Sequence, residues 1–508
     1  MRVVTPAEMN VVDKRMAEEF GMDTMLLMEN SARAITTYIV EHFAPEDKIL
    51  FVVGPGNNGG DGWAAARQLI CEGYCAKVIS LCGEDKMKHC VRKNYELAKV
   101  CGVEHWFHGT AKQVEELAAE SEVLVDAMFG TGFSGKPEGE VKEIIDKINE
   151  SGCFVVSVDV PSCINALTGQ VEGTAVQSDA VIVLGTLKTG MLLYPAADYV
   201  GEIVLAPISI PAVAYNQCEN RHVYGDENIA GMLIPRHANS FKGSYGKLGI
   251  IAGSKGFTGA ACLAAESALR SGAGLITLAV PESLNPIFEV KLTEQMTAPM
   301  PEDGFGHLVS SSELVNFLEQ KDAILVGPGL SMKADGERLI CDILENYHGK
   351  CVADADALNF IAEMNDFPSN INCELILTPH IGEAARLLGI TTQDVLNDSM
   401  ECAKKIAQKY HAVVVLKNAV SIICDPKGNI VFNTTGTNGM ATGGSGDVLA
   451  GIIASLAAQG CPAFSAAIAG AYINGLAGEL AAQKLGNIYM TPKDTIQALC
   501  DAFQQIDM

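Results

Sequence analysis

The amino-acid sequence predicts an α/β protein with two domains, each built around a largely parallel sheet covered by helices. Two observations predict this class. Short apolar runs rich in β-branched residues alternate with amphipathic stretches of helical period, which is typical of strands buried between helices. The alternation breaks once, near the middle of the chain, and then restarts. With 508 residues, 48% of them hydrophobic, the chain is long enough to bury two cores.

The first part of the chain contains apolar runs that we expect to form parallel strands. Amphipathic stretches such as 63–73 and 140–152 are expected to be helices. The expected strands span residues 49–54, 76–81, 123–129, 154–160 and 179–185.

The pattern loses its periodicity over residues 210–228, where Pro, Asn, Gln and Glu accumulate. We therefore place one domain at residues 1–215 and the other at residues 225–508. Two Ala- and Gly-rich segments, 447–459 and 466–483, are expected to be closely packed helices that end the second domain. The expected strands of this domain span residues 247–254, 275–281, 323–329, 351–356, 374–380, 413–418 and 421–425.

The composition excludes several classes of partner. The chain has 36 Lys and Arg against 61 Asp and Glu, a net charge of −25, which disfavours binding to nucleic acid and to anionic membranes. Any anionic ligand must therefore be held by local backbone amides or by isolated cations. The 16 cysteines form no metal-type CxxC pair, and no signal or transmembrane segment is evident, so a reducing, cytoplasmic location is expected.

The first expected strand is followed by Gly54, Gly56 and Gly59 in GxGxxG spacing, ahead of an expected helix. This context is typical of a dinucleotide-binding turn. However, polar residues crowd the turn, and no acidic residue stands about 20 positions further on. A second match at 130–135 also mimics a phosphate-binding loop, but Pro137 replaces the magnesium-binding Ser or Thr. Simple glycine turns at strand ends remain an alternative for both.

Polar side chains follow three expected strands of this domain. Asn58, Asp126, Asp159 and Ser162 all stand where a parallel strand ends, which is where open α/β sheets bind ligands. Asp159 is a candidate to carry a proton, and the other three are candidates to hold a monovalent cation. The alternative is that each Asp only caps a loop.

The segments GPGNNGGDG, DAMFGTGFSG and DVPSCINALTG resemble the NAD(P)H-hydrate epimerase domain, and the resemblance covers residues 1–215. It implies that Asn58, Asp126 and Ser162 bind potassium. Cys163 stands where this family usually has Gly. The resemblance also implies that the hydrated dinucleotide contacts Asn57, Asn58, Gly59, Gly60, Asp61, Gly130, Thr131, Gly132, Phe133, Ser134, Gly135, Lys136 and Asp159.

In the second domain, Gly443, Gly444 and Gly446 precede Asp447 at the start of an expected long helix. Flexible glycine amides and the helix dipole together form an anion-binding site with a carboxylate beside it. Such a site suits phosphoryl transfer, in which Asp447 accepts the proton of an attacking hydroxyl. The alternative is an Asp that only caps the helix.

This pattern resembles the ribokinase-like fold, and the segments at 247–281, 354–359 and 376–389 narrow it to ADP/ATP-dependent NAD(P)H-hydrate dehydratases. The resemblance implies that Ala261, Gly329, His380 and Asp447 contact the hydrate. Asn418 and Asn474 replace a usual Gly and a usual His; we expect Asn418 to be accommodated because Asn tolerates a left-handed backbone. The implied nucleotide-binding residues are Lys417, Asn418, Ala419, Val420, Ser421, Asn438, Gly439, Met440, Ala441, Thr442, Gly443, Gly444, Ser445 and Gly446.

Two of these residues have simpler alternatives. His380 follows Thr-Pro at a strand end, so it is expected to contact ligand or to hydrogen-bond within a loop and not to transfer protons. Lys417 is a candidate phosphate contact or else a solvated cation at a strand end.

Together the resemblances imply an N-terminal Rossmann-like three-layer α/β/α domain and a C-terminal ribokinase-like α/β/α domain. The expected enzyme epimerises the R and S hydrates of NADH and NADPH, NADHX and NADPHX, and dehydrates the S form. ADP or ATP with Mg²⁺ supplies a phosphoryl group, K⁺ serves the epimerase domain, and a homo-oligomer is expected. The alternatives are a vitamin-type small-molecule kinase fused to a ligand-sensing domain, and an oxidoreductase.

Overall fold

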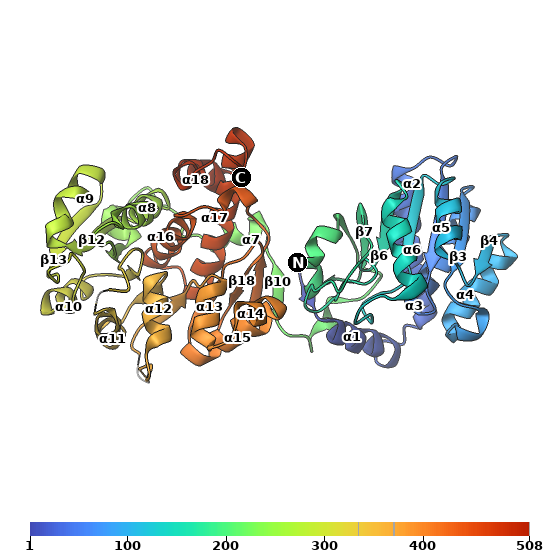
Figure 1. The fold of residues 1–508 in the computed structure, drawn as a ribbon, viewed down its shortest axis with the longest axis horizontal. Helices are drawn as coiled ribbons and strands as arrows, with labels where there is room; N and C mark the ends of the chain where they lie inside the picture. The colour runs from blue at the N-terminus through green and yellow to red at the C-terminus, as the bar shows by residue number, and fades with distance from the viewer. Residues whose placement is uncertain (334, 369–370, 507–508) are drawn as a thin grey trace. The chain divides into compact units, whose positions relative to one another are not determined.

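The computed structural model describes residues 1–333, 335–368 and 371–506, and it divides the chain into two compact units, Met1–Asn220 and Arg221–Met508 (Figure 1). This division falls within residues 216–224, the stretch between the two predicted domains. Each unit contains a predominantly parallel sheet with helices packed on it, so the predicted α/β class is confirmed.

The first unit has a seven-stranded, all-parallel sheet in the order β4-β3-β2-β5-β6-β7-β9. The chain proceeds outward in one direction from β2 and in the other from β5, so the sheet has its topological switch point between these two strands. The strands are β2 (Lys48–Val53), β3 (Cys75–Ser80), β4 (Glu104–Phe107), β5 (Val123–Ala127), β6 (Phe154–Val158), β7 (Ala180–Leu184) and β9 (Glu202–Ala206); β1 (Val3–Val4) and β8 (Leu187–Lys188) pair separately.

Burial and local capping explain these elements. β2, KILFVV, is exposed only at its first residue, as a strand covered on both faces requires. The first helix begins after Thr5, whose hydroxyl and the Glu8 carboxylate form a reciprocal capping box, with Pro6 at the first helical position. The helices are α1 (Pro6–Glu18), α2 (Thr24–His42), α3 (Asn57–Cys71), α4 (His89–Val100), α5 (Ala111–Ala118) and α6 (Gly139–Glu150).

The second unit has a ten-stranded sheet in the order β10-β19-β18-β17-β16-β15-β14-β11-β12-β13, with a switch point between β14 and β11. Its ladder is parallel except where β18 pairs antiparallel with β17 and β19, which agrees with the predicted largely parallel sheet. The strands are β10 (Arg221–Val223), β11 (Lys247–Ile251), β12 (Leu275–Pro281), β13 (Met296–Met300), β14 (Ala323–Val326), β15 (Lys350–Ala353), β16 (Glu374–Leu377), β17 (Val413–Leu416), β18 (Ser421–Cys424) and β19 (Ile430–Asn433).

The core of this unit contains the two predicted Ala- and Gly-rich helices, α16 (Ser445–Ala458) and α17 (Ala463–Leu485). α16 packs against α8 (Thr258–Arg270) and α17. The prediction that α17 ends the domain is wrong, because a further helix, α18 (Pro492–Ile506), follows α17 and packs against it. The other helices are α7 (Asp226–Ala230), α9 (Asn285–Lys291), α10 (Ser312–Leu318), α11 (Gly336–Asn346), α12 (Asp356–Glu363), α13 (Ile381–Leu388), α14 (Thr392–Asn397) and α15 (Ser399–Tyr410).

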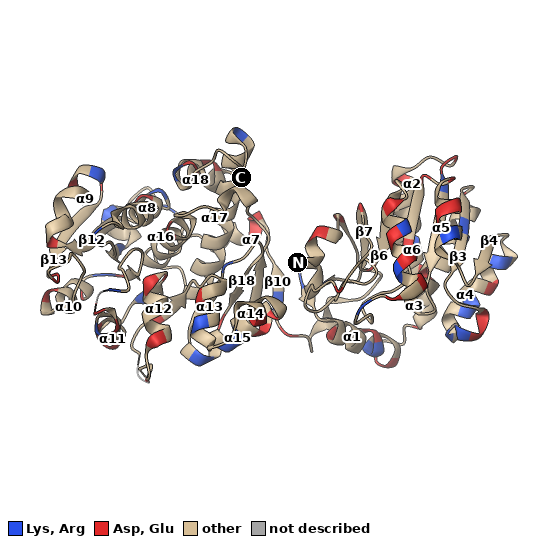
Figure 2. Cartoon of the chain, viewed as in Figure 1, with Lys and Arg blue, Asp and Glu red and all other residues tan. Residues whose placement is uncertain are grey.

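The charged residues lie mainly on the outer helices and loops, while the strands carry few of them (Figure 2). Among the described helices, none is both long and apolar enough to cross a lipid bilayer.

Candidate functional site

The first unit has a cavity of about 700 Å³ beside the ends of β2, β5 and β6. Most of the predicted hydrate-binding residues line it: Asn57, Asn58, Asp61, Gly130, Thr131, Gly132, Phe133, Ser134 and Asp159. Gly59, Gly60, Gly135 and Lys136 are not among the lining residues. Gly59 instead permits a close backbone contact, because a Cβ there would lie 1.9 Å from the carbonyl oxygen of Gly54.

Of the three predicted potassium ligands, Asp126 and Ser162 contact each other at the ends of β5 and β6, and Asn58 lies in the first turn of α3, after β2. The Ser162 hydroxyl donates to Asp126 Oδ1 at 2.6 Å, and the Ser162 backbone N–H donates to Asp126 Oδ2 at 2.8 Å. Asn58 is 8% exposed, its Nδ2 has no hydrogen-bond acceptor, and its side chain lies beside Gly130. Side-chain oxygens are the donors that a hard monovalent cation requires, so this set fits potassium.

Asp159 is held at the first unit's cavity by an ion pair with Lys188, whose side chain is 0% exposed. Two further carboxyls line the same cavity. Burial and the charge of Asp159 raise the pKa of Asp61 well above its usual range, despite a hydrogen bond from Ser31. Partial loss of hydration and the Asp159 charge raise the pKa of Asp13 to about 6, against the opposing charge of Lys188.

The sequence interpretation missed Lys188 and Asp13. Lys188 follows the expected strand 179–185 by three residues, so a cation just beyond a strand end was the available signal. Asp13 lies on α1, where no motif marked it.

Cys163, the residue that replaces a usual Gly, has a backbone φ of +75° and is 2% exposed. This left-handed conformation favours glycine, which explains why a Gly is expected here.

In the second unit, the glycine turn leads into α16 as predicted. Gly444 is the N-cap residue with φ of +105°, and Asp447 lies in the first turn of the helix. N–H groups of a first turn have no intrahelical acceptor, so those of Gly446 and Asp447 are available to an anion.

Lys417 is not a solvated cation, so the simpler alternative for it is wrong. Its Nζ donates to Asp354 Oδ1 at 2.7 Å, and the Thr378 hydroxyl donates to the same oxygen at 2.7 Å. The Asp354 side chain is 2% exposed and that of Lys417 18% exposed. Burial lowers the pKa of Lys417, but Asp354 and Glu383 outweigh it and hold the pKa above its usual value.

Two carboxyls beside this pair titrate near neutrality. Burial and the charge of Asp354 raise the pKa of Asp447 to about 7, against the opposing charge of Lys417. Burial also raises the pKa of Glu383 to about 7, although Lys417 opposes the shift. A carboxyl that exchanges its proton near pH 7 is suited to general-base chemistry.

His380 acts as the N-cap of α13, where its Nδ1 accepts a hydrogen bond from the Gly382 N–H at 2.9 Å. Its Nε2 lies 3.3 Å from Glu383 Oε1. Burial and the charge of Lys417 lower the pKa of His380, so the neutral ring is favoured. This geometry matches the loop hydrogen-bonding alternative, and the side chain remains 54% exposed.

The other residues predicted to contact the hydrate differ in their placement. Ala261 is 0% exposed and belongs to the core, so its side chain presents no surface to a ligand. Gly329 lies in the loop after β14 with φ of +65°, where a Cβ would lie 2.7 Å from the Phe257 carbonyl oxygen.

The predicted nucleotide-binding residues form two segments. Residues 417–421 turn from β17 into β18, and Asn438–Met440 form a short 3-10 helix ahead of the glycine turn. Asn418 does not have a positive φ, so the left-handed conformation invoked for it is wrong and the substitution needs no special backbone. Asn474 is 7% exposed, and its Oδ1 has no hydrogen-bond donor.

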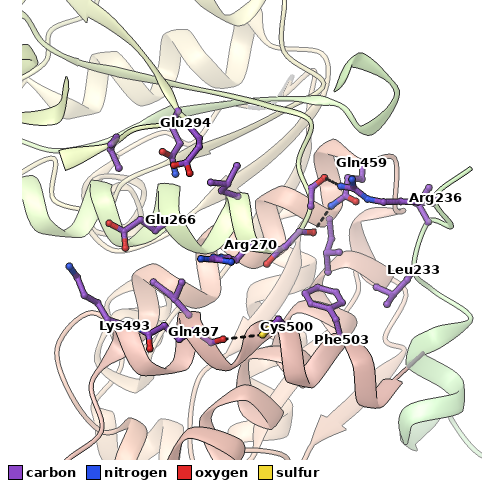
Figure 3. Close-up of a pocket in the computed structure, with 18 of the residues that line it drawn as sticks. Leu233, Arg236, Glu266, Arg270, Glu294, Gln459, Lys493, Gln497, Cys500 and Phe503 are labelled. Atoms are coloured by element: carbon purple, nitrogen blue, oxygen red, sulfur yellow. Dashed lines mark hydrogen bonds between the residues drawn. The ribbon is translucent and has the colours of Figure 1, made fainter. Parts of the chain in front are cut away.

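A larger cavity of about 960 Å³ lies near the C-terminal ends of α8 and α16 and along α18 (Figure 3). Arg270, Lys493, Glu266 and Glu294 line it, and no predicted site residue does. Among the described residues, no three His, Cys, Asp or Glu side chains are grouped as a metal site requires.

The fold and the two sites define a two-domain enzyme of nucleotide chemistry. The model of the NAD(P)H-hydrate dehydratase family matches residues 248–500, and that of the YjeF-related protein N-terminus matches residues 24–190. The chain is 37% identical to the bifunctional NAD(P)H-hydrate repair enzyme of Moorella thermoacetica, over 98% of this chain and 96% of that protein. It is 36% identical to that of Thermofilum pendens, over 97% and 94%. The chain belongs to the family of bifunctional NAD(P)H-hydrate repair enzymes.

The fold of the second unit agrees with this assignment. A ribokinase-like superfamily protein from Enterococcus faecalis is 26% identical, with a TM-score of 0.51, and the match covers 56% of this chain and 96% of that one. The predicted resemblance, the pairing of an epimerase with a dehydratase, and the ribokinase-like fold are therefore confirmed.

Proposed function

We propose that the second unit dehydrates the S form of NADHX and NADPHX through a phosphorylated intermediate, with Asp447 as the base and ADP or ATP as the donor. The observation that carries this proposal is the position of Asp447. It lies in the first turn of α16, directly after the glycine turn, and a Cβ on the preceding Gly446 would lie 3.3 Å from Lys417 Nζ. The anion-binding amides and a base with a pKa of about 7 thus lie together at the first turn of α16.

In the proposed reaction, the hydroxyl oxygen on C6 of the hydrated ring forms a bond to the terminal phosphorus of the nucleotide. The bond from that phosphorus to its bridging oxygen breaks, and Asp447 takes the hydroxyl proton. The amides of the glycine turn and Lys417 offset the charge on the transferring group. The C6–O bond then breaks as phosphate leaves with the electron pair, assisted by the ring nitrogen, and transfer of the C5 proton to solvent restores the C5–C6 double bond.

Mg²⁺ is expected to reach this site with the nucleotide. It is normally held by phosphate oxygens and few protein carboxylates. The ion would supply charge neutralisation at the phosphates.

We propose that the first unit interconverts the R and S hydrates in the cavity lined by Asp159. Ring nitrogen-assisted ionisation at C6 requires a group that handles the hydroxyl proton, and Asp159 is fixed for this by Lys188. The oxygen atoms of Asn58, Asp126 and Ser162 support a potassium ion beside it. The functional domains are proposed as residues 1–215 and 225–508, and the protein is proposed to act in the cytoplasm.

The test is to incubate the protein with each epimer of hydrated NADH, Mg²⁺ and either ADP or ATP. Recovery of the reduced-nicotinamide absorbance and release of inorganic phosphate are expected together. Asp447→Asn should lower the rate at least 100-fold, whereas Asp366→Asn, the same change at an exposed position of this unit, should not. A stable phosphorylated product would instead identify a small-molecule kinase.

A further inference from the structure

The sequence motif at residues 354–359 has no role in the function proposed so far, although its first residue is one of the most buried acids of the second unit. Asp354 is 1% exposed and accepts hydrogen bonds from both Lys417 Nζ and the Thr378 hydroxyl at 2.7 Å. These partners follow β17 and β16, while Asp354 follows β15. Three neighbouring strand ends thus converge on one carboxylate oxygen.

The backbone around Asp354 is fixed by close contacts. Its N–H donates to the carbonyl oxygen of Val326 at 3.1 Å, and its own carbonyl oxygen would lie 1.8 Å from a Cβ on Gly327. The next residue, Ala355, has φ of +50°. A non-glycine residue held in this conformation indicates that the surroundings impose it, and such positions cluster at functional sites.

The second oxygen of Asp354 faces the start of α16. A Cβ on Gly446 would lie 3.9 Å from Asp354 Oδ2 and 3.3 Å from Lys417 Nζ. Asp354 and Lys417 therefore lie against the residue that precedes the proposed base.

We propose that Asp354 is a positioning residue of the dehydratase, which fixes the Lys417 ammonium against the glycine turn and sets the charge around Asp447. The proposal rests on the function proposed for Asp447. Asp354 touches neither substrate nor nucleotide in this scheme; it acts through Lys417 and through its own charge.

The charged groups around Asp447 determine how the loss of Asp354 changes the pKa of Asp447. Asp354 and Asp356, at the end of β15 and the start of α12, and Lys417, after β17, act on Asp447 directly. Of the groups on α13 and its N-cap, His380 and Glu383 face Lys417 and Asp354 instead, and Arg386 faces His380 and Glu383. The charge of Asp354 is the strongest influence on the pKa of Asp447 after burial, and it raises that pKa. Without it, Lys417 is left unbalanced and stabilises the Asp447 carboxylate, so the pKa of the base falls.

The experiment is the pH profile of kcat/KM for dehydration by the full chain with ADP. Asp354→Asn keeps the size and a hydrogen-bond acceptor but removes the charge. The acid limb, which reports the base, should move about one pH unit lower, and the rate on the alkaline plateau should fall about tenfold because the base is weaker. Asp366→Asn removes an exposed carboxylate of the same unit and should leave both unchanged.

A purely structural role for Asp354 predicts a different result. The rate would then fall equally at every pH with the acid limb in place, and this outcome overturns the proposal. If Asp354→Asn does not fold, Asp354→Ser removes the same charge with a smaller side chain. The same shift of the acid limb and the same loss of rate are expected for it. Asp447→Asn separates the two hypotheses: if it retains activity the proposed function fails, and if it is inactive while Asp354→Asn keeps its acid limb, only the positioning role fails.

Discussion

Lys188 and Asp159 form an ion pair in the first unit in which the lysine side chain is completely buried. The Lys188 ammonium also donates to the carbonyl oxygen of Leu184 at 2.7 Å, while the Asp159 side chain is 14% exposed at the cavity. Asp159 has φ of +68° directly after β6. The lysine thus neutralises and orients a carboxylate whose backbone is itself constrained.

Lys188→Met is expected to destabilise the first unit by about 3 kcal/mol, because removing one partner leaves a carboxylate without compensation. Epimer exchange should fall with it, because Asp159 loses the group that orients it. Urea unfolding and the exchange rate measure the two effects. Adding Asp159→Asn to Lys188→Met should recover most of the stability but none of the exchange; equal stabilities of the single variant and the wild type would contradict this account.

The expected strands that are confirmed are those with continuous apolar runs, such as β2 and β5, because burial on both faces imposes that composition. β9 and β13 were not predicted. They lie at sheet edges and each has only one buried residue, so burial on both faces does not impose a long apolar run on them.

The residues of the candidate sites also fall into two kinds, those that a local sequence pattern reveals and those that it does not. The glycine turns and Asp447 are local patterns, so the sequence reveals them. Asp354 and Lys417 are 63 residues apart, and Asp159 and Lys188 are 29 apart. Asp354 and Lys417 meet because the strands they follow end at the same edge of the sheet, and Lys188 reaches Asp159 from β8, beyond the end of β7. No local spacing signals either pair.

Gly54→Ala tests the close packing that forms the first glycine turn. A Cβ on Gly54 would lie 1.9 Å from the carbonyl oxygen of Met128, so strands β2 and β5 must separate to admit it. We expect a loss of more than about 2 kcal/mol in the free energy of unfolding of the first unit. Gly56→Ala is the control, because nothing lies within 4 Å of its Cβ and its φ is −87°. Thermal unfolding in which both variants melt alike would refute the explanation.

Cys163 offers a test of backbone strain through two substitutions. Alanine removes the sulfur but keeps the unfavourable φ of +75°, whereas glycine removes the sulfur and also relieves the backbone. Cys163→Gly is therefore expected to be more stable than Cys163→Ala by about 1 kcal/mol, as measured by denaturant unfolding. An alanine variant as stable as the glycine variant would show that the conformation costs nothing.

Ionisation of the buried Asp447 carboxyl is expected to lower the stability of the second unit at neutral and alkaline pH. Burial and the charge of Asp354 raise its pKa from 3.8 to about 7, so the folded state keeps a proton that the unfolded chain has released. The favourable contribution of the protonated form is complete below pH 4 and is lost progressively as the pH rises to about 7. Asp447→Asn cannot ionise, and it should therefore be more stable than the wild type by about 2 kcal/mol at pH 8, with the difference vanishing near pH 4. Thermal unfolding of both proteins without nucleotide across this range measures the difference. If the difference is the same at both ends, ionisation of Asp447 is not its cause.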